Sequence, residues 1–405
     1  AEAAPFLNRA SRRLDDALEI VKPIVQDVRD RGDVAVREYA EKLDGFTGES
    51  FIVESCGELD PALLESVTIA AKNIRDFAQQ QLVKPWQTTT SDGRTLGQLV
   101  RPLDSVGVYV PAGRYPLLST MLMTVIPAQV AGVGTITVVC PQPNTQILAL
   151  AKWLGLKTIV QLGGAHAIAS LAYGTQSIAK VQRIVGPGNS YVAAAKKLVA
   201  GDVGIDFVAG PSEIVLVASA GDPTWIAADM LAQCEHDVDA RAILVTTSTA
   251  LANEVQTQVA LQLLTLPTAD VASSAVANNS AIIVCQSVEE IIELVNEIAP
   301  EHLAIPDESL PVDSFVDKIV NAGSIFVGRF STEAAGDYAS GPNHVLPTSG
   351  VAALRGGLSV NDFVKVITTQ SLSEDALRQL TPAVTQLARA EGLEAHARSV
   401  EVRQR

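Results

Sequence analysis

The chain of 405 residues is too long for one ordinary hydrophobic core, so we expect two or more domains. Apolar residues make up 47% and charged residues 19% of it, which is typical of a globular protein and not of a disordered one. The formal net charge of -15 argues against nucleic acid as a partner, because phosphate binding needs clustered lysine and arginine.

Cysteine usage and apolar runs bear on where the protein works. The four cysteines are widely scattered and form no CxxC pair, which favours a reducing compartment over a disulfide framework. No apolar run is long enough to span a bilayer, and no charged-then-apolar signal opens the chain. We therefore expect a cytoplasmic protein that has no membrane partner.

Two helices are expected before residue 100. Apolar residues at intervals of three and four predict the first helix, and Gly32 then offers a stop. Its periodic positions are Leu14, Leu18, Val21, Val25 and Val28. Asp60 followed by Pro61 predicts the start of a second helix, by a cap and a first-turn proline, and it extends to about Leu82.

From about residue 106, short β-branched runs alternate with helical stretches. The expected strands are 106–110, 135–140, 158–162, 183–185, 207–208 and 214–217. The expected helices between them are 119–131, 145–154, 167–173 and 191–199. This alternation predicts a parallel, doubly wound sheet.

The alternation begins again where Asp222-Pro223 opens a helix that reaches Cys234. Later strands are expected at 242–246, 281–284 and 324–327, and helices at 250–264 and 288–298. Two such blocks predict an α/β fold of two related doubly wound, mostly parallel-sheet (Rossmann-like) domains with helical N-terminal and C-terminal segments. We expect one domain from residues 1–104 with 213–355, another from 105–212, and a helical tail from 356–405.

Gln233 and His236 stand three residues apart at the end of the helix that begins near Pro223. They share a helix face, so both can point at one centre. An imidazole nitrogen and an amide oxygen can both bind zinc, although the amide is an unusual ligand. The alternative is a polar helix end, where histidine is favoured by the helix dipole.

Three further places combine histidine with a carboxylate. The loop Gly336–His344 follows a strand, where α/β proteins place ligands, so Asp337 is a candidate ligand and His344 a candidate substrate contact. An Asx-turn with a surface histidine is the alternative. Glu301-His302 closes a helix and offers two proton acceptors, which suits a reaction that deprotonates an alcohol and activates water. Glu391 and His396, by spacing alone, belong to an ordinary charged helix.

The best candidate for a dinucleotide turn is Ile184–Tyr191, which follows a strand and runs into a helix. Tyr191 stands where a third glycine belongs, so the fingerprint is incomplete. Asp206 lies about twenty residues beyond Gly186, where a ribose-binding acid is expected. No GxxxxGK[ST] motif occurs, so the sequence does not support nucleotide hydrolysis.

Taken together, these segments resemble the histidinol dehydrogenase family. The resemblance runs from about residue 24 to 398 in the family's order, and GDYASGPNHVLPTSG is its most specific block. The other matching segments are 163–169, 184–191, 204–213, 233–237, 300–303, 357–360 and 391–398. The resemblance implies zinc-dependent, four-electron oxidation of L-histidinol through bound L-histidinaldehyde to L-histidine with two NAD, the last steps of histidine biosynthesis.

The resemblance also assigns residues. It implies one zinc per subunit, held by Gln233, His236, Asp337 and His396, and it gives the acid–base roles to Glu301 and His302. The substrate contacts that it implies are Ser212, Gln233, His236, His302, Asp337, His344, Glu391 and His396. The cofactor contacts that it implies are Tyr109, His166 and Asn189. It implies a homodimer with shared active sites, in which the tail reaches the partner subunit and completes its site.

Two segments depart from the family's pattern. His166 stands where the family usually has glutamine, and an imidazole is shorter, more rigid and titratable. Pro111–Tyr115 departs from a Pro-Gly-Gly turn, since Ala112 restricts the backbone and Arg114 adds a charge. We expect these two departures to affect which cofactor and which substrate the protein accepts.

Three other functions compete with this one. A paralogous NAD-dependent dehydrogenase of another amino alcohol or a sulfonated diol could keep the zinc and acid–base residues. A non-catalytic NAD- or zinc-binding regulator is disfavoured, because it has no need of Glu301 and His302 beside a full ligand set. A purely structural zinc protein is disfavoured because structural sites prefer thiolates, and the chain has no thiolate cluster.

Overall fold

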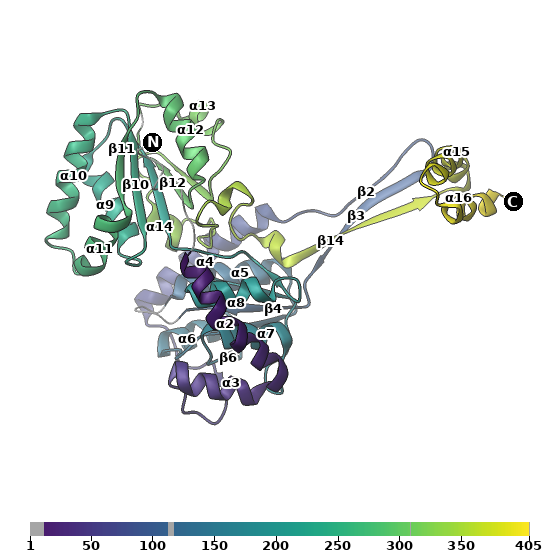
Figure 1. Ribbon diagram of the computed structural model, residues 1–405, viewed down its shortest axis with the longest axis horizontal. Helices are drawn as coiled ribbons and strands as arrows, with labels where there is room; N and C mark the ends of the chain where they lie inside the picture. The colour runs from purple at the N-terminus through teal and green to yellow at the C-terminus, as the bar shows by residue number, and fades with distance from the viewer. Residues whose placement is uncertain (1–11, 112–116, 308, 405) are drawn as a thin grey trace. The chain divides into compact units, whose positions relative to one another are not determined.

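The computed structural model describes residues 12–111, 117–307 and 309–404 (Figure 1). The chain divides into two compact units. The first unit comprises Ala1–Gln81 and Leu103–Phe363, and the second comprises Leu82–Pro102 and Val364–Arg405. None of the described helices combines enough length with enough apolar character to traverse a bilayer.

A six-stranded sheet in the first unit has the strand order β1-β6-β5-β4-β7-β8. Its central strands are parallel, as the β-branched runs predicted, and only β1 at one edge runs antiparallel, to β6. The strands are β1 (Ile52–Glu54), β4 (Ser105–Tyr109), β5 (Thr135–Val139), β6 (Thr158–Val160), β7 (Arg183–Val185) and β8 (Gly204–Ile205).

Helices cover both faces of this first sheet. Successive residues of β5, Val138 and Val139, belong to different buried clusters, as expected for a strand covered on both sides. One cluster joins α2 (Arg12–Arg31), α3 (Asp33–Tyr39), α7 (Gly164–Tyr173) and α8 (Ser190–Val199). The other joins α4 (Pro61–Gln81), α5 (Leu118–Ala131) and α6 (Thr145–Trp153). A π-helical turn, η1 (Ala40–Asp44), follows α3.

A five-stranded, fully parallel sheet follows in the same unit, with the order β11-β10-β9-β12-β13. Its strands are β9 (Glu213–Val217), β10 (Arg241–Thr246), β11 (Ala281–Val284), β12 (His302–Ile305) and β13 (Ser324–Val327). On β9, Ile214 and Leu216 face one buried cluster, while Val215 and Val217 face the other. The strand is therefore buried on both sides.

Helices on the two faces of this second sheet complete the unit. α9 (Pro223–Cys234), α10 (Thr249–Leu263) and α11 (Ala269–Asn279) share one cluster, and α12 (Val288–Ile298) and α13 (Val312–Val316) the other. α14 (Glu333–Tyr338) contacts α9. Short 3-10 turns are η2 (Val351–Ala353) and η3 (Val360–Phe363). Asp222 caps α9 by accepting the N–H of Thr224, with Pro223 in the first turn, as the sequence indicated.

The second unit is built around a three-stranded antiparallel sheet. β3 (Arg94–Pro102) lies between β2 (Trp86–Thr89) and β14 (Val364–Leu372). Two helices and a 3-10 turn follow, α15 (Glu374–Ala390), α16 (Glu394–Glu401) and η4 (Val402–Gln404). The tail was expected to be helical throughout, but β14 precedes its helices because it pairs with β3 along nine residue pairs.

The α/β class and the two parallel sheets are confirmed, but several local expectations differ. Residues 207–208 lie outside any strand, and the short strand β8 comes just before them. His302 begins β12 and does not close a helix, because it continues the second sheet beside β9 and β13. α11, β1, β2 and β3 were not expected.

The N-terminal residues pack differently from the expected grouping of 1–104 with 213–355. α2 packs against α7 and α8 of the first sheet, and β1 pairs with β6. The physical reason is the apolar stripe of α2, in which Ala17, Val21, Val25 and Val28 are buried in the cluster that α7 and α8 share. Residues 82–102 leave this unit to join β14.

Candidate active site and metal centre

The candidate acid–base and metal residues of the first unit gather at the amino-terminal edge of the second sheet. Glu301 directly precedes β12, and His302 is its first residue, paired with Ile214 of β9. We expected the loop at 336–344 to lie at the carboxyl edge of a strand. Instead, α14 carries Asp337 to within 3.8 Å of His302 Nε2 at the amino edge, because the chain runs back along the sheet after β13.

His302 is buried, and a single hydrogen bond decides its tautomer. Its Nδ1 lies 3.0 Å from the carbonyl oxygen of Glu213, which can only accept, so Nδ1 carries the hydrogen. Burial lowers the pKa of His302 to about 4, although Asp337 opposes the shift. The imidazole is therefore neutral, and Nε2 is an acceptor with no partner among the described residues. This is the state that a general base needs.

Glu301 is oriented by the same residue of β9. Its Oε2 accepts the backbone N–H of Glu213 at 2.8 Å, and its side chain is buried. Burial raises the pKa of Glu301 well above its ordinary value, and the nearby carboxylates of Glu213 and Asp337 raise it further. The hydrogen bond from the backbone N–H of Glu213 acts in the opposite direction and lowers the pKa. Glu213 thus positions both candidates through its backbone, a role for which the sequence held no signal.

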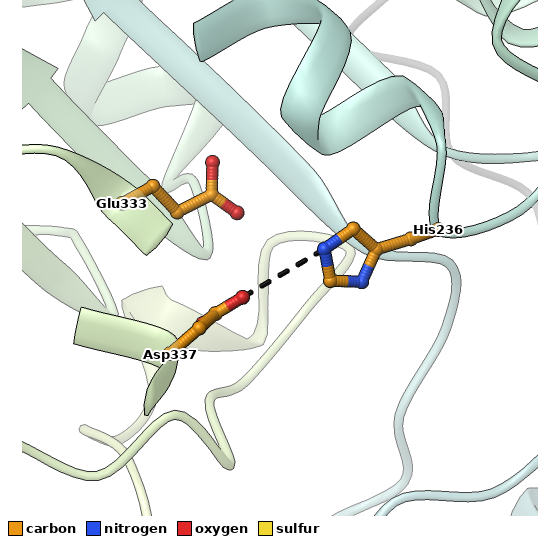
Figure 2. Close-up of side chains that lie close together, drawn as sticks. All are labelled: His236, Glu333 and Asp337. Carbon is orange, nitrogen blue, oxygen red and sulfur yellow. Dashed lines mark ion pairs between the residues drawn. The ribbon is translucent and has the colours of Figure 1, made fainter. Parts of the chain in front are cut away.

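Three ligand-type side chains meet beside His302. One ligand atom each from His236, Glu333 and Asp337 lies within 4.8 Å of the others (Figure 2). His236 Nε2 lies 3.7 Å from Asp337 Oδ2. Figure 2 shows the two carboxylates on α14 and the imidazole just beyond the end of α9 pointing toward a common centre. His236 and Asp337 were predicted as ligands, and the structure brings them together.

The residues around this centre suit a bound metal ion. Gln233 is fully buried on α9, yet neither atom of its amide has a hydrogen-bond partner among the described residues. The same holds for both carboxylate oxygens of Glu333. Unpaired buried polar groups of this kind cost about 1–3 kcal/mol each, so they require a ligand or a proton. Nitrogen and oxygen donors without thiolates are the set expected of a catalytic zinc site.

Glu333 was not predicted. It is the first residue of α14, four residues before Asp337, so both side chains project from one face of the helix. Burial raises the pKa of Glu333 well above its ordinary value, and Asp337, Glu301 and Asp229 add to the effect. The spacing of two carboxylates four apart on one helix was the signal that could have identified it.

His344 and Ser212 lie near the same centre. Nδ1 of His344 donates to the backbone oxygen of Asp337 at 2.8 Å, and its Nε2 lies 3.5 Å from Thr120 Oγ1. Burial lowers the pKa of His344, so this imidazole is neutral as well. Ser212 directly precedes Glu213 and accepts the N–H of Arg241 through its backbone oxygen.

Glu391 and His396 belong to the second unit. Glu391 directly follows α15, His396 lies in α16, and both side chains are exposed. The ligands predicted for zinc are therefore divided between the units, with Gln233, His236 and Asp337 in the first. In the segment Pro111–Tyr115, which departs from the family's Pro-Gly-Gly turn, residues 112–115 lie outside the described residues.

The expected cofactor residues lie at the carboxyl edge of the first sheet. Tyr109 ends β4, and Asn189 caps α8 by accepting the N–H groups of Tyr191 and Val192. His166 lies in the first turn of α7 and is fully buried. A parallel sheet with helix N-termini at its carboxyl edge is the usual place for a nucleotide.

Asp206 does not fill the role of a ribose-binding acid. Its Oδ2 accepts the N–H of Gly186 at 2.8 Å, and its Oδ1 pairs with Lys196 Nζ at 2.7 Å, both deep in the protein. The pair supports the turn that leads to Asn189. Gly186 has φ of 112°, and a Cβ there would overlap the carbonyl oxygen of Tyr109, so only glycine fits.

Comparison with known proteins now identifies the family. The family model of histidinol dehydrogenase matches residues 7–404. A histidinol dehydrogenase from Geobacillus kaustophilus is 49% identical over 396 residues, which cover 95% of this chain and 93% of the relative. One from Bacillus subtilis is 45% identical over 403 residues, covering 96% and 94%. The chain belongs to the histidinol dehydrogenase family.

Solved structures agree with this assignment. The crystal structure of histidinol dehydrogenase from Elizabethkingia anophelis has a TM-score of 0.90 and 38% identity, covering 95% of this chain and 91% of that one. An acetylating aldehyde dehydrogenase from Geobacillus thermoglucosidasius, at 12% identity and a TM-score of 0.51, shares the fold alone. Membership of the histidinol dehydrogenase family makes this chain an oxidoreductase.

Proposed function

We propose that this chain oxidises L-histidinol through bound L-histidinaldehyde to L-histidine, the last steps of histidine biosynthesis, with zinc and NAD. One observation supports the proposal above all others. The neutral His302 directs its free Nε2 toward Asp337 in the candidate metal centre, and Glu301 lies beside it. A base and a second proton acceptor beside a ligand cluster suit an oxidation that also consumes water.

Gln233, His236 and Asp337 would hold zinc, with His396 as the fourth ligand. When bound, zinc would hold the amine and imidazole nitrogens of the substrate and so fix the position of its alcohol carbon. Ser212, His344 and Glu391 would contact the substrate around this centre. Of the three proposed ligands in the first unit, His236 is the exposed one, so the centre can be reached from solvent.

His302 and Glu301 divide the proton transfers. In the first oxidation, His302 Nε2 takes the hydroxyl proton as hydride leaves the alcohol carbon, which gives the aldehyde. Glu301 then removes a proton from water as its oxygen adds to the aldehyde carbon, which gives the hydrate. A second loss of hydride and proton from the hydrate gives the acid. NAD, bound by Tyr109, His166 and Asn189, would supply the hydride acceptor for each two-electron step.

We further propose a homodimer in which α16 supplies His396 to the site of the partner subunit. Three of the proposed ligands belong to the first unit and His396 belongs to the second, so a tail that reaches the partner subunit would supply the fourth ligand there. All four cysteines are free, which suits the cytoplasmic location proposed with this activity.

The test is the amount of NADH formed per L-histidinol consumed, with zinc present and after removal by a chelator. We expect two NADH per histidinol, loss of activity with the metal, and recovery when zinc returns. If protein that holds zinc and binds NAD formed no NADH from histidinol, the proposed substrate would be wrong. Oxidation of another amino alcohol or of a sulfonated diol would then identify a paralogous dehydrogenase.

A further inference from the structure

A buried carboxylate–imidazole pair lies at the carboxyl edge of the first sheet, away from the metal centre. Nε2 of His166 lies 3.0 Å from Oδ2 of Asp44, the last residue of the turn η1. The His166 ring is fully buried and stacks on Tyr39, with ring centroids 6.3 Å apart. The chain brings Asp44 and His166 together across 122 residues, so local sequence does not reveal the pair.

The hydrogen bonds around Asp44 define the tautomer of His166. Asp44 Oδ2 also accepts the N–H of Gly163 at 2.8 Å, so this oxygen acts as an acceptor toward both groups. The hydrogen of a neutral imidazole therefore lies on Nε2, and Nδ1 is left as an acceptor. Nδ1 is buried without a partner among the described residues and lies 3.8 Å from where a Cβ on Gly164 would stand.

The free acceptor therefore lies at the N-terminal turn of α7. This turn is held at two successive residues, since Gly163 donates to Asp44 and Gly164 donates to the hydroxyl of Tyr109 at 3.1 Å. Tyr109 and His166 are two of the three residues proposed to contact the cofactor. A buried acceptor without a donor is unfavourable, so this site favours a ligand that brings a hydroxyl or N–H group.

An imidazole held in this way keeps the donor and acceptor order of an amide. A glutamine at this position would donate its Nε2 hydrogens to Asp44 and present Oε1 at the other end. His166 presents Nε2–H to Asp44 and Nδ1 at the other end. Histidine thus offers the same acceptor at this turn only while a carboxylate holds the opposite nitrogen.

We propose that Asp44 is a positioning residue of the cofactor site, holding His166 so that Nδ1 accepts a hydrogen bond from a hydroxyl or N–H group of NAD. The proposal rests on the proposed function, because it needs NAD to bind at this edge. Asp44 does not touch the cofactor and acts through His166 and the first turn of α7. The choice of a hydroxyl or N–H group over a phosphate follows from the tautomer, since ionised phosphate oxygens cannot donate.

The first experiment measures the dissociation constant of NAD by calorimetry, without substrate. Asp44→Ala should weaken NAD binding by about tenfold, because Nε2 of His166 loses the acceptor that holds the ring with Nδ1 facing the cofactor. Asp44→Asn keeps one acceptor oxygen and should stay within about threefold of wild type. Glu41→Ala, an exposed acid in the same turn, is the matched control and should bind NAD as wild type does.

A double-mutant cycle tests whether Asp44 acts through His166. His166→Leu alone should weaken NAD binding by about tenfold, whereas His166→Gln should stay within about threefold. Adding Asp44→Ala to His166→Leu should cost less than about threefold more, since the partner is already absent. In turnover assays, Asp44→Ala should raise KM for NAD and leave kcat within about threefold.

Nitrogen-15 NMR of histidine-labelled protein gives a readout independent of activity and stability. The His166 signals, identified by their loss in His166→Gln, should show hydrogen on Nε2 alone, and Nδ1 should shift when NAD is added. Folding of each variant is checked by its unfolding midpoint.

Hydrogen on Nδ1, or folded Asp44→Ala protein with wild-type affinity for NAD, would overturn the role of Asp44 while leaving the dehydrogenase intact. Wild-type protein that binds no NAD would overturn the proposed function and this inference with it.

Discussion

At the residue scale, the chemistry of His302 depends on what surrounds its ring. The Glu213 carbonyl holds the hydrogen on Nδ1, and burial keeps the ring neutral by lowering its pKa to about 4. Nε2 is then the only basic atom that the ring offers, and it lies on the side of Asp337. His236, at the end of α9, belongs to the ligand cluster. The two histidines should therefore fail in different ways when replaced.

His302→Asn should lower kcat by about a thousandfold, because the variant lacks the proposed general base. It should keep its zinc, since His302 is not among the proposed ligands, and elemental analysis measures this directly. His236→Asn is the contrasting variant and should lose both metal and activity. Loss of zinc from His302→Asn would contradict the separation of ligand and base.

Glu333 gives a prediction about stability in the metal-free protein. Burial first, and then Asp337, Glu301 and Asp229, raise its pKa well above the ordinary 4.5. When the pKa of a carboxyl is higher in the folded than in the unfolded protein, protonation favours the folded state. This stabilisation is complete below the unfolded-state pKa and is lost as the pH rises. Metal-free wild-type protein should therefore lose stability through this group as the pH rises above the ordinary 4.5.

Glu333→Gln cannot ionise, so metal-free protein with this change should melt about 2–4 °C higher than wild type at pH 8, with a smaller difference at pH 5. The measurement is the unfolding temperature by circular dichroism. Glu254→Gln, at an exposed site on α10, is the matched control and should show no such difference. If Glu333→Gln and wild-type protein melted at the same temperature at pH 8, ionisation of Glu333 would not destabilise the metal-free protein.

At the element scale, the turn between β7 and α8 depends on a buried ion pair. Lys196 on α8 donates to the backbone oxygen of Gly186 and pairs with Asp206, which also accepts the N–H of Gly186. The helix, the turn and the segment after β8 are thereby joined. Asn189, the cap of α8 and a proposed cofactor contact, lies in this turn.

Lys196→Met should destabilise the protein by about 3–5 kcal/mol, because it leaves the carboxylate of Asp206 buried without its counter-charge. Denaturant unfolding measures the change. Lys197→Met, at the next residue but exposed, is the matched control and should change stability by less than about 0.5 kcal/mol. If both variants unfolded at the same denaturant concentration, the pair would not support the turn.

Element by element, the sequence was most informative where local rules decide. The Asp222-Pro223 cap and the apolar repeat that follows it define α9, and α12, β11 and β13 have the predicted bounds. The sequence was least informative for strands that are short or that lack a buried face. β12 carries only four residues after Glu301. β2 and β14 are mostly exposed and β3 is mostly half-buried, so these three lack a buried strand's apolar run.

At the scale of the whole molecule, the residues proposed for the active site are divided between the two units. Gln233, His236 and Asp337 belong to the first unit, whereas His396 and Glu391 belong to the second. If two subunits share their sites, as proposed, then one chain's catalytic residues should work with the tail of the other.

Mixing two inactive variants tests this arrangement. His302→Asn and His396→Ala subunits should each be inactive alone. After exchange in a 1:1 mixture, half of the dimers are mixed and each has one intact site, so about a quarter of wild-type activity should return. Mixing His302→Asn with Glu301→Gln, whose defects fall in the same site, is the control and should restore nothing. No recovery in exchanged His302→Asn and His396→Ala dimers would contradict shared sites.

By itself, the sequence determined the α/β class, the main helices with their caps, and the residues that resemble the family's site. Those features depend on neighbours within a few positions, or on motifs that can be read along the chain. Only the tertiary structure decided the pairing of β3 with β14, the hydrogen on His302 Nδ1, the burial of Glu333 and the contact of Asp44 with His166. Each depends on groups far apart in the chain, whose protonation and burial exist only once packing brings them together.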